Sequence, residues 1–115
     1  MGLTTPYKLM IMTTFKNFTP HAITLNNGRE FASEGLARVS ATFSKFDENG
    51  VCNQEFGQVT GLPEPADNTL YIVSALVLTA AKAQGRTDCV APATGHTECK
   101  RNDKGFIVSV PGFVR

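Results

Sequence analysis

The clearest pattern in the chain is a continuous apolar run that leads directly into a helix-forming segment. Residues 70–73 read Leu-Tyr-Ile-Val, which is typical of a central strand covered on both faces. Residues 75–84 are rich in strong helix formers, Ser74 can cap their first turn, and Gly85 stands where a helix end favours a positive φ. The sequence therefore predicts a buried strand and, packed on it, a helix. The residues expected to bury this helix are Val73, Val77, Ala80, Ala81 and Leu76.

Turn residues divide most of the remaining chain into antiparallel hairpins. Clusters of Asn, Asp and Gly at 26–28, 47–50 and 102–105 are typical of hairpin turns. The strands that they join are expected at 23–25 with 29–32, at 36–46 with 51–60, and at 97–101 with 106–110. In the middle hairpin, apolar and polar side chains alternate strictly over 36–46, as in a half-buried strand. The face expected to be buried there carries Ala37, Val39, Ala41 and Phe43.

Together with a short strand expected at 88–91, these elements predict an α+β domain. Its sheet would be mostly antiparallel, with about five to seven strands packed on one central helix. The chain has 115 residues, a usual size for one domain. Residues 1–14 show neither alternation nor helical periodicity. We therefore expect a flexible or docking N-terminal arm at 1–14 and a single α+β domain at 15–115.

Composition narrows the classes of partner. Hydrophobic residues make up 42% of the chain and charged residues 18%, which argues for a folded domain rather than a disordered one. The formal net charge is +1, so no overall field draws the chain to nucleic acid, and a low net charge permits a homo-oligomer. Three cysteines are too few for a disulfide scaffold, and no apolar run is long enough to span a bilayer. We expect a cytoplasmic protein without a membrane partner.

The residue types that bind zinc come closest together in a C-x6-H-x2-C spacing. Its members are Cys89, His96 and Cys99, with Cys52 or His21 required as the fourth ligand. No C-x2-C pair is present, and buried free cysteines are commoner than zinc ligands in such a pattern. We therefore expect no bound metal and no cofactor. The same residues lack the local context of a catalytic nucleophile, so no enzyme activity is expected.

Two places in the chain could hold a small ligand. A strand that runs straight into a helix can present backbone N–H groups to an anion beside Ser74, although no glycine-rich phosphate loop is present and the usual dinucleotide fold is excluded. Arg86 could belong to a local basic pocket, although scattered solvated charges are commoner. Its other cations would be Lys82, Lys100, Arg101 and Lys104. His21 follows an extended Thr-Pro segment, where an imidazole is more often structural than a site residue.

Four short motifs occur in order along most of residues 17–92. They read Asn17-Phe18-Thr19-Pro20-His21, Ala37-Arg38-Val39-Ser40, Val59-Thr60-Gly61-Leu62-Pro63 and Tyr71-Ile72-Val73-Ser74. In these motifs the chain resembles an uncharacterised family of small phage-encoded proteins, with the pattern N-x-T-P-H, A-R-V-S, V-T-G-L-P and Y-I-V-S. The resemblance brings no assigned catalytic residues. It implies a phage setting, in which small proteins often bind host factors or sequester host signals.

We therefore expect a small phage-type accessory protein of the host cytoplasm that acts by binding. It would inhibit a host protein or sequester a small nucleotide-like ligand. The candidate ligand-binding residues are His21, Arg38, Ser74 and Arg86. Two alternatives stay open: a small enzyme that acts on a nucleotide or peptide through His21 or His96, and a structural virion component.

Overall fold

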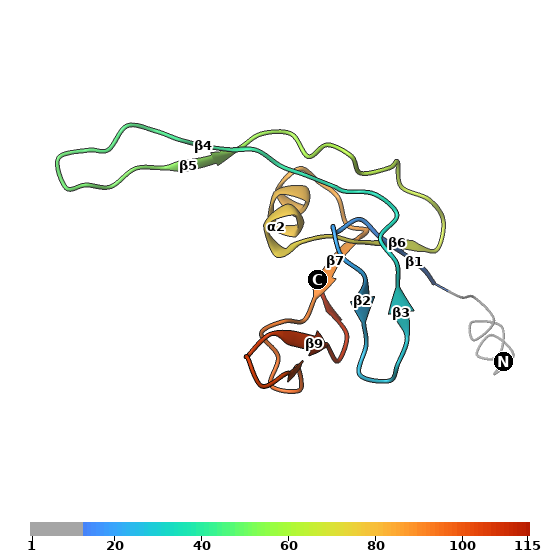
Figure 1. The fold of residues 1–115 in the computed structure, drawn as a ribbon. Coiled ribbons are helices and arrows are strands. Elements are labelled where there is room, and N and C mark those ends of the chain that lie inside the picture. The colour runs from blue at the N-terminus through green and yellow to red at the C-terminus, as the bar shows by residue number, and fades with distance from the viewer. Residues whose placement is uncertain (1–12) are drawn as a thin grey trace, which may run out of the picture.

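The computed structural model describes residues 13–115, which form one short helix and many short strands (Figure 1). The helix is α2 (Ala75–Ala83). The strands are β1 (Thr14–Asn17), β2 (Ile23–Thr24), β3 (Glu30–Phe31), β4 (Ala41–Phe43), β5 (Gln54–Phe56), β6 (Thr69–Ile72), β7 (Cys89–Pro92), β8 (Lys100–Arg101), β9 (Ile107–Ser109) and β10 (Phe113–Val114). The fold is thus mixed and mostly β. Of the N-terminal arm expected at 1–14, residues 1–12 lie outside the described residues.

The main sheet has four strands in the order β1-β6-β7-β10. Strand β6 pairs in parallel with β1 on one side and with β7 on the other, while β10 is antiparallel to β7. In the described residues, the remaining strands form three separate two-stranded sheets. The single, mostly antiparallel sheet of five to seven strands is therefore not what these residues form. Alternation along a strand specifies which side chains share a face, but it does not specify the partner strand.

Helix α2 begins and ends where the local signals place it. The Ser74 hydroxyl oxygen accepts a hydrogen bond from the backbone N–H of Val77 (3.3 Å), and Gly85 follows the helix with φ +92°. These contacts satisfy backbone groups at both helix ends. The buried residues are Val77, Leu78, Ala80 and Ala81. The burial predicted for Leu76 is wrong, because this side chain lies just outside the buried stripe and is 46% exposed.

Strand β6 is buried on both faces, as its continuous apolar run predicts. Tyr71 and Val73 pack on one face with the buried residues Val77, Leu78, Ala81, Cys89 and Ala91. An aromatic cluster joins two strands of the main sheet to the β2–β3 hairpin. It consists of Phe15 of β1, Phe31 of β3 and Phe113 of β10, with ring centroids 5.3–5.7 Å apart. The helix and the β2–β3 hairpin therefore both contribute side chains that cover the main sheet. Within residues 13–115, no helix is long and apolar enough to cross a membrane.

The three predicted hairpins are confirmed, with shorter strands than expected. Strand β2 pairs with β3, β4 with β5, and β8 with β9, and each turn contains a glycine of positive φ: Gly28, Gly50 and Gly105. The prediction of a half-buried strand over 36–46 is wrong in extent and burial. Only Ala41–Phe43 is a strand, and Phe43 is 65% exposed because the hairpin projects away from the main sheet (Figure 1).

A buried asparagine connects the end of β1 to two other segments. The Asn17 side chain is fully buried, and its Nδ2 donates hydrogen bonds to the carbonyl oxygens of His21 (2.8 Å) and Phe31 (2.9 Å). Its Oδ1 accepts from the backbone N–H (2.9 Å) and the hydroxyl (2.7 Å) of Thr19. The amide therefore folds the segment 17–21 back on itself and attaches it to β3. This accounts structurally for the asparagine and threonine of the N-x-T-P-H motif.

We expect Asn17→Ala to destabilise the fold by about 3–5 kcal/mol, because it removes the buried donor to the carbonyl oxygens of His21 and Phe31 and the acceptor of the Thr19 N–H and hydroxyl. Asn17→Asp should be as harmful, since it removes both donors and buries a charge. Urea unfolding curves measure the change. Asn53→Ala is the matched control on an exposed asparagine and should stay within about 0.5 kcal/mol of the wild type. Similar stabilities for all three variants would contradict this role of the Asn17 amide.

Candidate functional site: a pocket beside the start of the helix

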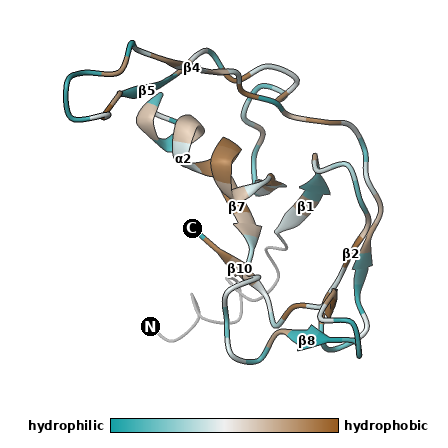
Figure 2. Ribbon diagram, turned by 60° about the vertical axis from the view of Figure 1, so that its left-hand side comes forward, coloured by the Kyte–Doolittle hydropathy of each residue, from teal (hydrophilic) through white to brown (hydrophobic). Residues whose placement is uncertain are grey.

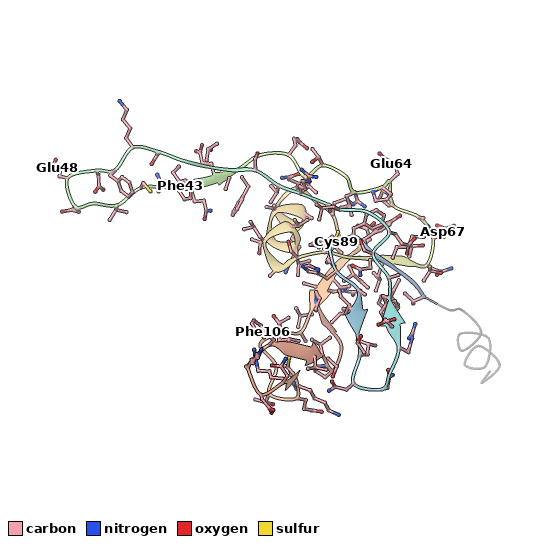
Figure 3. All side chains as sticks on the ribbon, in the orientation of Figure 1. Phe43, Glu48, Glu64, Asp67, Cys89 and Phe106 are labelled. Carbon is pink, nitrogen blue, oxygen red and sulfur yellow. The ribbon has the colours of Figure 1, made fainter. Side chains whose placement is uncertain are left out.

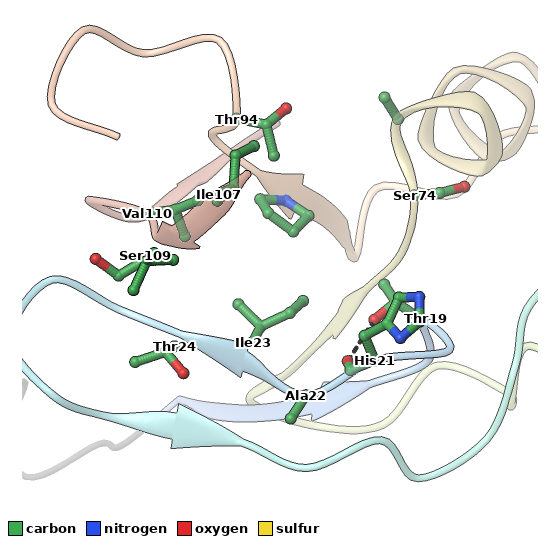
Figure 4. Close-up of a pocket in the computed structure, with 13 residues that line it drawn as sticks. Thr19, His21, Ala22, Ile23, Thr24, Ser74, Thr94, Ile107, Ser109 and Val110 are labelled. Carbon is green, nitrogen blue, oxygen red and sulfur yellow. Dashed lines mark hydrogen bonds between the residues drawn. The ribbon is translucent and has the colours of Figure 1, made fainter. Parts of the chain in front are cut away.

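A pocket of about 460 Å³ lies between the β2–β3 hairpin, the start of α2, the end of β7 and strand β9 (Figure 4). It brings together two of the four predicted site residues, His21 and Ser74. The full lining consists of Thr19, His21, Ala22, Ile23, Thr24, Ser74, Ala75, Pro92, Thr94, Ile107, Val108, Ser109 and Val110. Residues that are far apart in the sequence thus share one concave surface.

The walls of this pocket are held by long-range hydrogen bonds. Asn26 and Val110 bond through their backbones (2.8 Å), and the Val110 N–H donates to the carbonyl oxygen of Thr24 (3.0 Å). The Ser109 hydroxyl donates to Oδ1 of Asn26 (2.6 Å). On the other side, Asn17 fixes the backbone of His21, as described above. The β2–β3 hairpin is therefore tied both to β1 and to the C-terminal strands, and the pocket lies between these ties.

The pocket is lined by both apolar and polar side chains. Its apolar surface comes from Ala22, Ile23, Ala75, Pro92, Ile107, Val108 and Val110. Its polar groups are the His21 imidazole and the hydroxyls of Thr19, Thr24, Ser74, Thr94 and Ser109, and no carboxylate, lysine or arginine side chain of residues 13–115 lines it. The first N–H groups of a helix lack intrahelical partners, so the start of α2 adds donors at this edge. Such a lining fits a flat or apolar ligand that also carries hydroxyl or anionic groups.

Arg86 lies at a different place. It lines a smaller hollow of about 220 Å³ with Gln58, Val59, Leu62 and Gln84. Its guanidinium group makes two hydrogen bonds of 2.9 Å to the Asp88 carboxylate and one of 2.9 Å to the carbonyl oxygen of Pro63. The guanidinium also lies 5.8 Å from the centre of the Tyr71 ring. These contacts give Arg86 a structural role, which is to hold the extended Pro63–Pro65 segment against the sheet.

The Arg86–Asp88 pair changes the acid–base behaviour of both groups. The hydrogen bonds from Arg86, followed by its positive charge, lower the pKa of the Asp88 carboxyl against the opposing effect of burial. The same hydrogen bonds raise the pKa of Arg86. The carboxylate is thus stabilised in the form that accepts both hydrogen bonds.

Arg38 lines neither pocket. It is exposed and forms an isolated antiparallel bridge with Thr60, through N–H to carbonyl bonds of 2.8 Å in both directions. Of the four cations expected to join Arg86, only Lys82 lies at the same helix end. Lys100, Arg101 and Lys104 lie on the β8–β9 hairpin, where Arg101 donates to the carbonyl oxygen of Gly105 (2.9 Å). The structure therefore separates Arg38 and Arg86 from the pocket that holds His21 and Ser74.

The residues of the C-x6-H-x2-C spacing do not form a metal-binding cluster in the described structure. Among residues 13–115, no three His, Cys, Asp or Glu side chains lie together in a way that could hold a metal ion. Nδ1 of His96 accepts a hydrogen bond from the N–H of Glu98 (3.0 Å), and the Cys99 thiol donates to the carbonyl oxygen of Ser109 (3.4 Å). Cys89 is buried in the core, where burial and the neighbouring Asp88 charge raise the pKa of its thiol to about 11. At neutral pH this thiol is protonated and is a poor nucleophile.

Comparison of the chain with protein-family models, with curated proteins and with solved structures gave no match. The geometry of the pocket therefore carries the functional argument. Most of its lining was missed by reasoning from the sequence, including Pro92, Thr94, Ile107 and Ser109. No local signal marks these residues, because Pro92 and Thr94 are placed by the pairing of β7 in the main sheet and Ile107 and Ser109 by the docking of the C-terminal segment on the β2–β3 hairpin.

We expect Asp88→Asn to lower the free energy of unfolding at pH 7 by about 1–2 kcal/mol, because the charge-assisted bonds to Arg86 are lost at a partly exposed site. A carboxylate whose pKa is lowered by folding adds stability above its unfolded pKa of about 3.9. That contribution is lost as the pH falls through the lower, folded pKa. The difference between wild type and variant should therefore shrink below about pH 4. Urea unfolding at several pH values measures it.

The control for this pair is Asp103→Asn, which changes an exposed carboxylate that forms no ion pair in the described part of the chain. It should show no comparable loss at pH 7. A difference between wild type and Asp88→Asn that stays constant down to acidic pH would contradict the coupling of Asp88 to Arg86.

The cysteines should react in a fixed order. Under native conditions near pH 7, we expect a maleimide to label the partly exposed Cys52 and Cys99 before the buried Cys89, whose thiol is both shielded and protonated. Peptide mass mapping after short exposure measures the order, and a sample unfolded in urea, in which all three should react, is the control. Early labelling of Cys89 in the folded protein would contradict its burial.

Proposed function

We propose that this chain is a non-catalytic accessory protein of phage type that binds a small nucleotide-like ligand in the pocket between His21 and Ser74, and thereby sequesters a host signal. One observation supports this proposal most directly: apolar side chains line the same pocket as Ser74 and Ala75, the residues at the start of α2. Its volume of about 460 Å³ lies within the range usual for small-ligand sites. The resemblance to phage-encoded proteins supports the setting, which we propose to be the host cytoplasm.

The roles in this proposal follow from the chemistry of the lining. Ile23, Pro92 and Val110 offer apolar surface on which a base or another flat group can lie. The Ser74 hydroxyl and the N–H groups at the start of α2 offer hydrogen bonds to a phosphate or carboxylate. His21 adds a further hydrogen-bonding group at the rim. We propose no catalytic step, since none of the described residues that line this pocket carries a carboxylate to orient or assist the imidazole.

The variant Ser74→Asp tests whether an anionic group of the ligand lies at the start of α2. Aspartate is as good an N-cap as serine, so the helix should stay intact, while the new charge repels an anion at the helix start. Binding is measured by isothermal titration with AMP, ADP and GMP, and with adenosine and guanosine as ligands that lack phosphate. We expect at least one nucleotide to bind, and Ser74→Asp to weaken it by about tenfold or more, equal to about 1.4 kcal/mol.

Asn53→Asp is the matched control, because it adds the same charge at an exposed position on the β4–β5 hairpin. It should leave the affinity unchanged. His21→Ala should weaken binding of the same nucleotide. If none of the nucleotides and nucleosides binds the wild type, or if Ser74→Asp and Asn53→Asp bind equally well, a nucleotide-like ligand in this pocket is refuted.

A further inference from the structure

The β4–β5 hairpin forms an arm that projects from the rest of the chain (Figure 1). We define the arm as residues 40–57, which lie between the backbone bond of Gly57 to Ser40 and the turn at Gly50. The radius of gyration is 17.5 Å, whereas a compact domain of about 100 residues has about 13 Å. Both edges of this two-stranded sheet lack a further strand in the described residues. The arm therefore has little support from its own chain.

The arm carries apolar side chains that nothing in the described chain covers. Phe43 is 65% exposed and Phe46 is 71% exposed, and both stand on the projecting segment (Figure 3 labels Phe43). Val51 and Phe56 are also exposed. Four exposed large apolar residues on one hairpin form the kind of surface that marks a protein interface.

The arm is also acidic. It contains three carboxylates, Asp47, Glu48 and Glu55, and one cation, Lys45, which gives a net charge of −2. In residues 13–115, the only ion pair is that of Arg86 with Asp88, so the charges of the arm have no ionic partner within the described chain. A partner for this surface should therefore combine apolar and basic groups.

The C-terminal hairpin, residues 100–109, has that combination. It contains three cations, Lys100, Arg101 and Lys104, and one carboxylate, Asp103, which gives a net charge of +2. Its exposed apolar residues are Phe106, Ile107 and Val108, of which Phe106 is 66% exposed. The charges and the apolar residues of this hairpin therefore complement those of the arm.

The arm and the C-terminal hairpin do not meet within one chain. Figure 1 shows them on different sides of the main sheet, and Figure 2, a view rotated by 60°, shows β4 and β5 at one end of the molecule and β8 at the other. A contact between these two surfaces therefore requires two copies of the chain.

We propose that the arm of one copy docks on the C-terminal hairpin of a second copy. Phe43 and Phe56, which share one face of the arm, would lie against Phe106 and Val108, and Asp47 and Glu48 at the turn of the arm would face the three cations. Contact between two arms is disfavoured, because it would bring together two surfaces of charge −2. Each copy carries both surfaces, so two copies can dock reciprocally in a two-fold dimer, or the contact can repeat from copy to copy in a ring or a filament.

The docked arm would lie beside the ligand pocket, since Val108 belongs to both surfaces. The association itself rests on the two hairpins and not on a ligand. It can therefore be tested on the protein without added nucleotide, and its outcome is independent of the proposed ligand.

The test uses two double charge reversals and sedimentation velocity at low ionic strength over a range of protein concentrations. Glu48→Lys with Glu55→Lys makes the arm basic, and Lys100→Glu with Lys104→Glu makes the C-terminal hairpin acidic. We expect the wild type to form dimers or larger oligomers, and each reversed protein alone to associate at least about tenfold more weakly. An equimolar mixture of the two should assemble again, because each basic surface then meets an acidic one.

Two controls separate docking from general effects of the substitutions. Glu64→Lys with Asp67→Lys makes the same change of charge on exposed residues outside both surfaces and should assemble as the wild type does. Phe43→Ser with Phe46→Ser should weaken assembly, whereas Leu76→Ser, an exposed apolar residue on α2, should not. Circular dichroism melting confirms that each variant is folded.

Three results would overturn the proposal: a monomeric wild type at every concentration, a mixture of the reversed proteins that fails to assemble, or assembly that is lost on reversing the arm but kept on reversing the C-terminal hairpin. The last result would show that the arm binds a different surface of the second copy.

Discussion

The arrangement of this fold depends on the buried amide of Asn17. Its two N–H groups and its oxygen serve three segments: the end of β1, the Thr19–His21 bend and the end of β3. A buried amide stabilises a structure only when its groups are all paired, so the position of each segment is constrained by the others. Backbone hydrogen bonds strengthen the same junction. The Asn17 carbonyl oxygen accepts from the N–H of Glu34 (2.8 Å), and the N–H of the next residue, Phe18, donates to the carbonyl oxygen of Ile72 (2.8 Å). One residue thus joins the main sheet to the hairpin that walls the pocket.

The features that were predictable from the sequence are those determined by neighbouring residues. Ser74 and Gly85 mark the ends of α2, and the glycines of three turns mark the hairpins, because a cap or a positive φ is a local requirement. Strand β1 gives no such signal. It has only four residues, and the one that is fully buried is the polar Asn17. Its parallel pairing with β6 depends on residues far along the chain, and so does the division of the strands into separate sheets.

The difference between local and long-range determinants also explains which residues of the site could be predicted. His21 and Ser74 could be selected as candidates because each stands at a local structural boundary, and the structure places both at one pocket. Arg86 could be selected as a cation near a helix end, but its role depends on Asp88 and on the carbonyl of Pro63, which bring it to the sheet instead. Ser109 of β9 and the following Val110 close this side of the pocket through hydrogen bonds to the β2–β3 hairpin. These bonds join residues that are far apart in the sequence, so no local pattern predicts them.

The failed prediction for residues 36–46 carries information of its own. Strict alternation of apolar and polar side chains is expected where one face of a strand is buried, yet of the apolar positions on that face only Ala37 is buried in the described chain. The alternation continues outward into the arm, to Phe43, which residues 13–115 leave 65% exposed. An exposed strand with this alternation is expected where another molecule covers its apolar face. The docking proposed above assigns that cover to a second copy of this chain, whose C-terminal hairpin is basic and apolar.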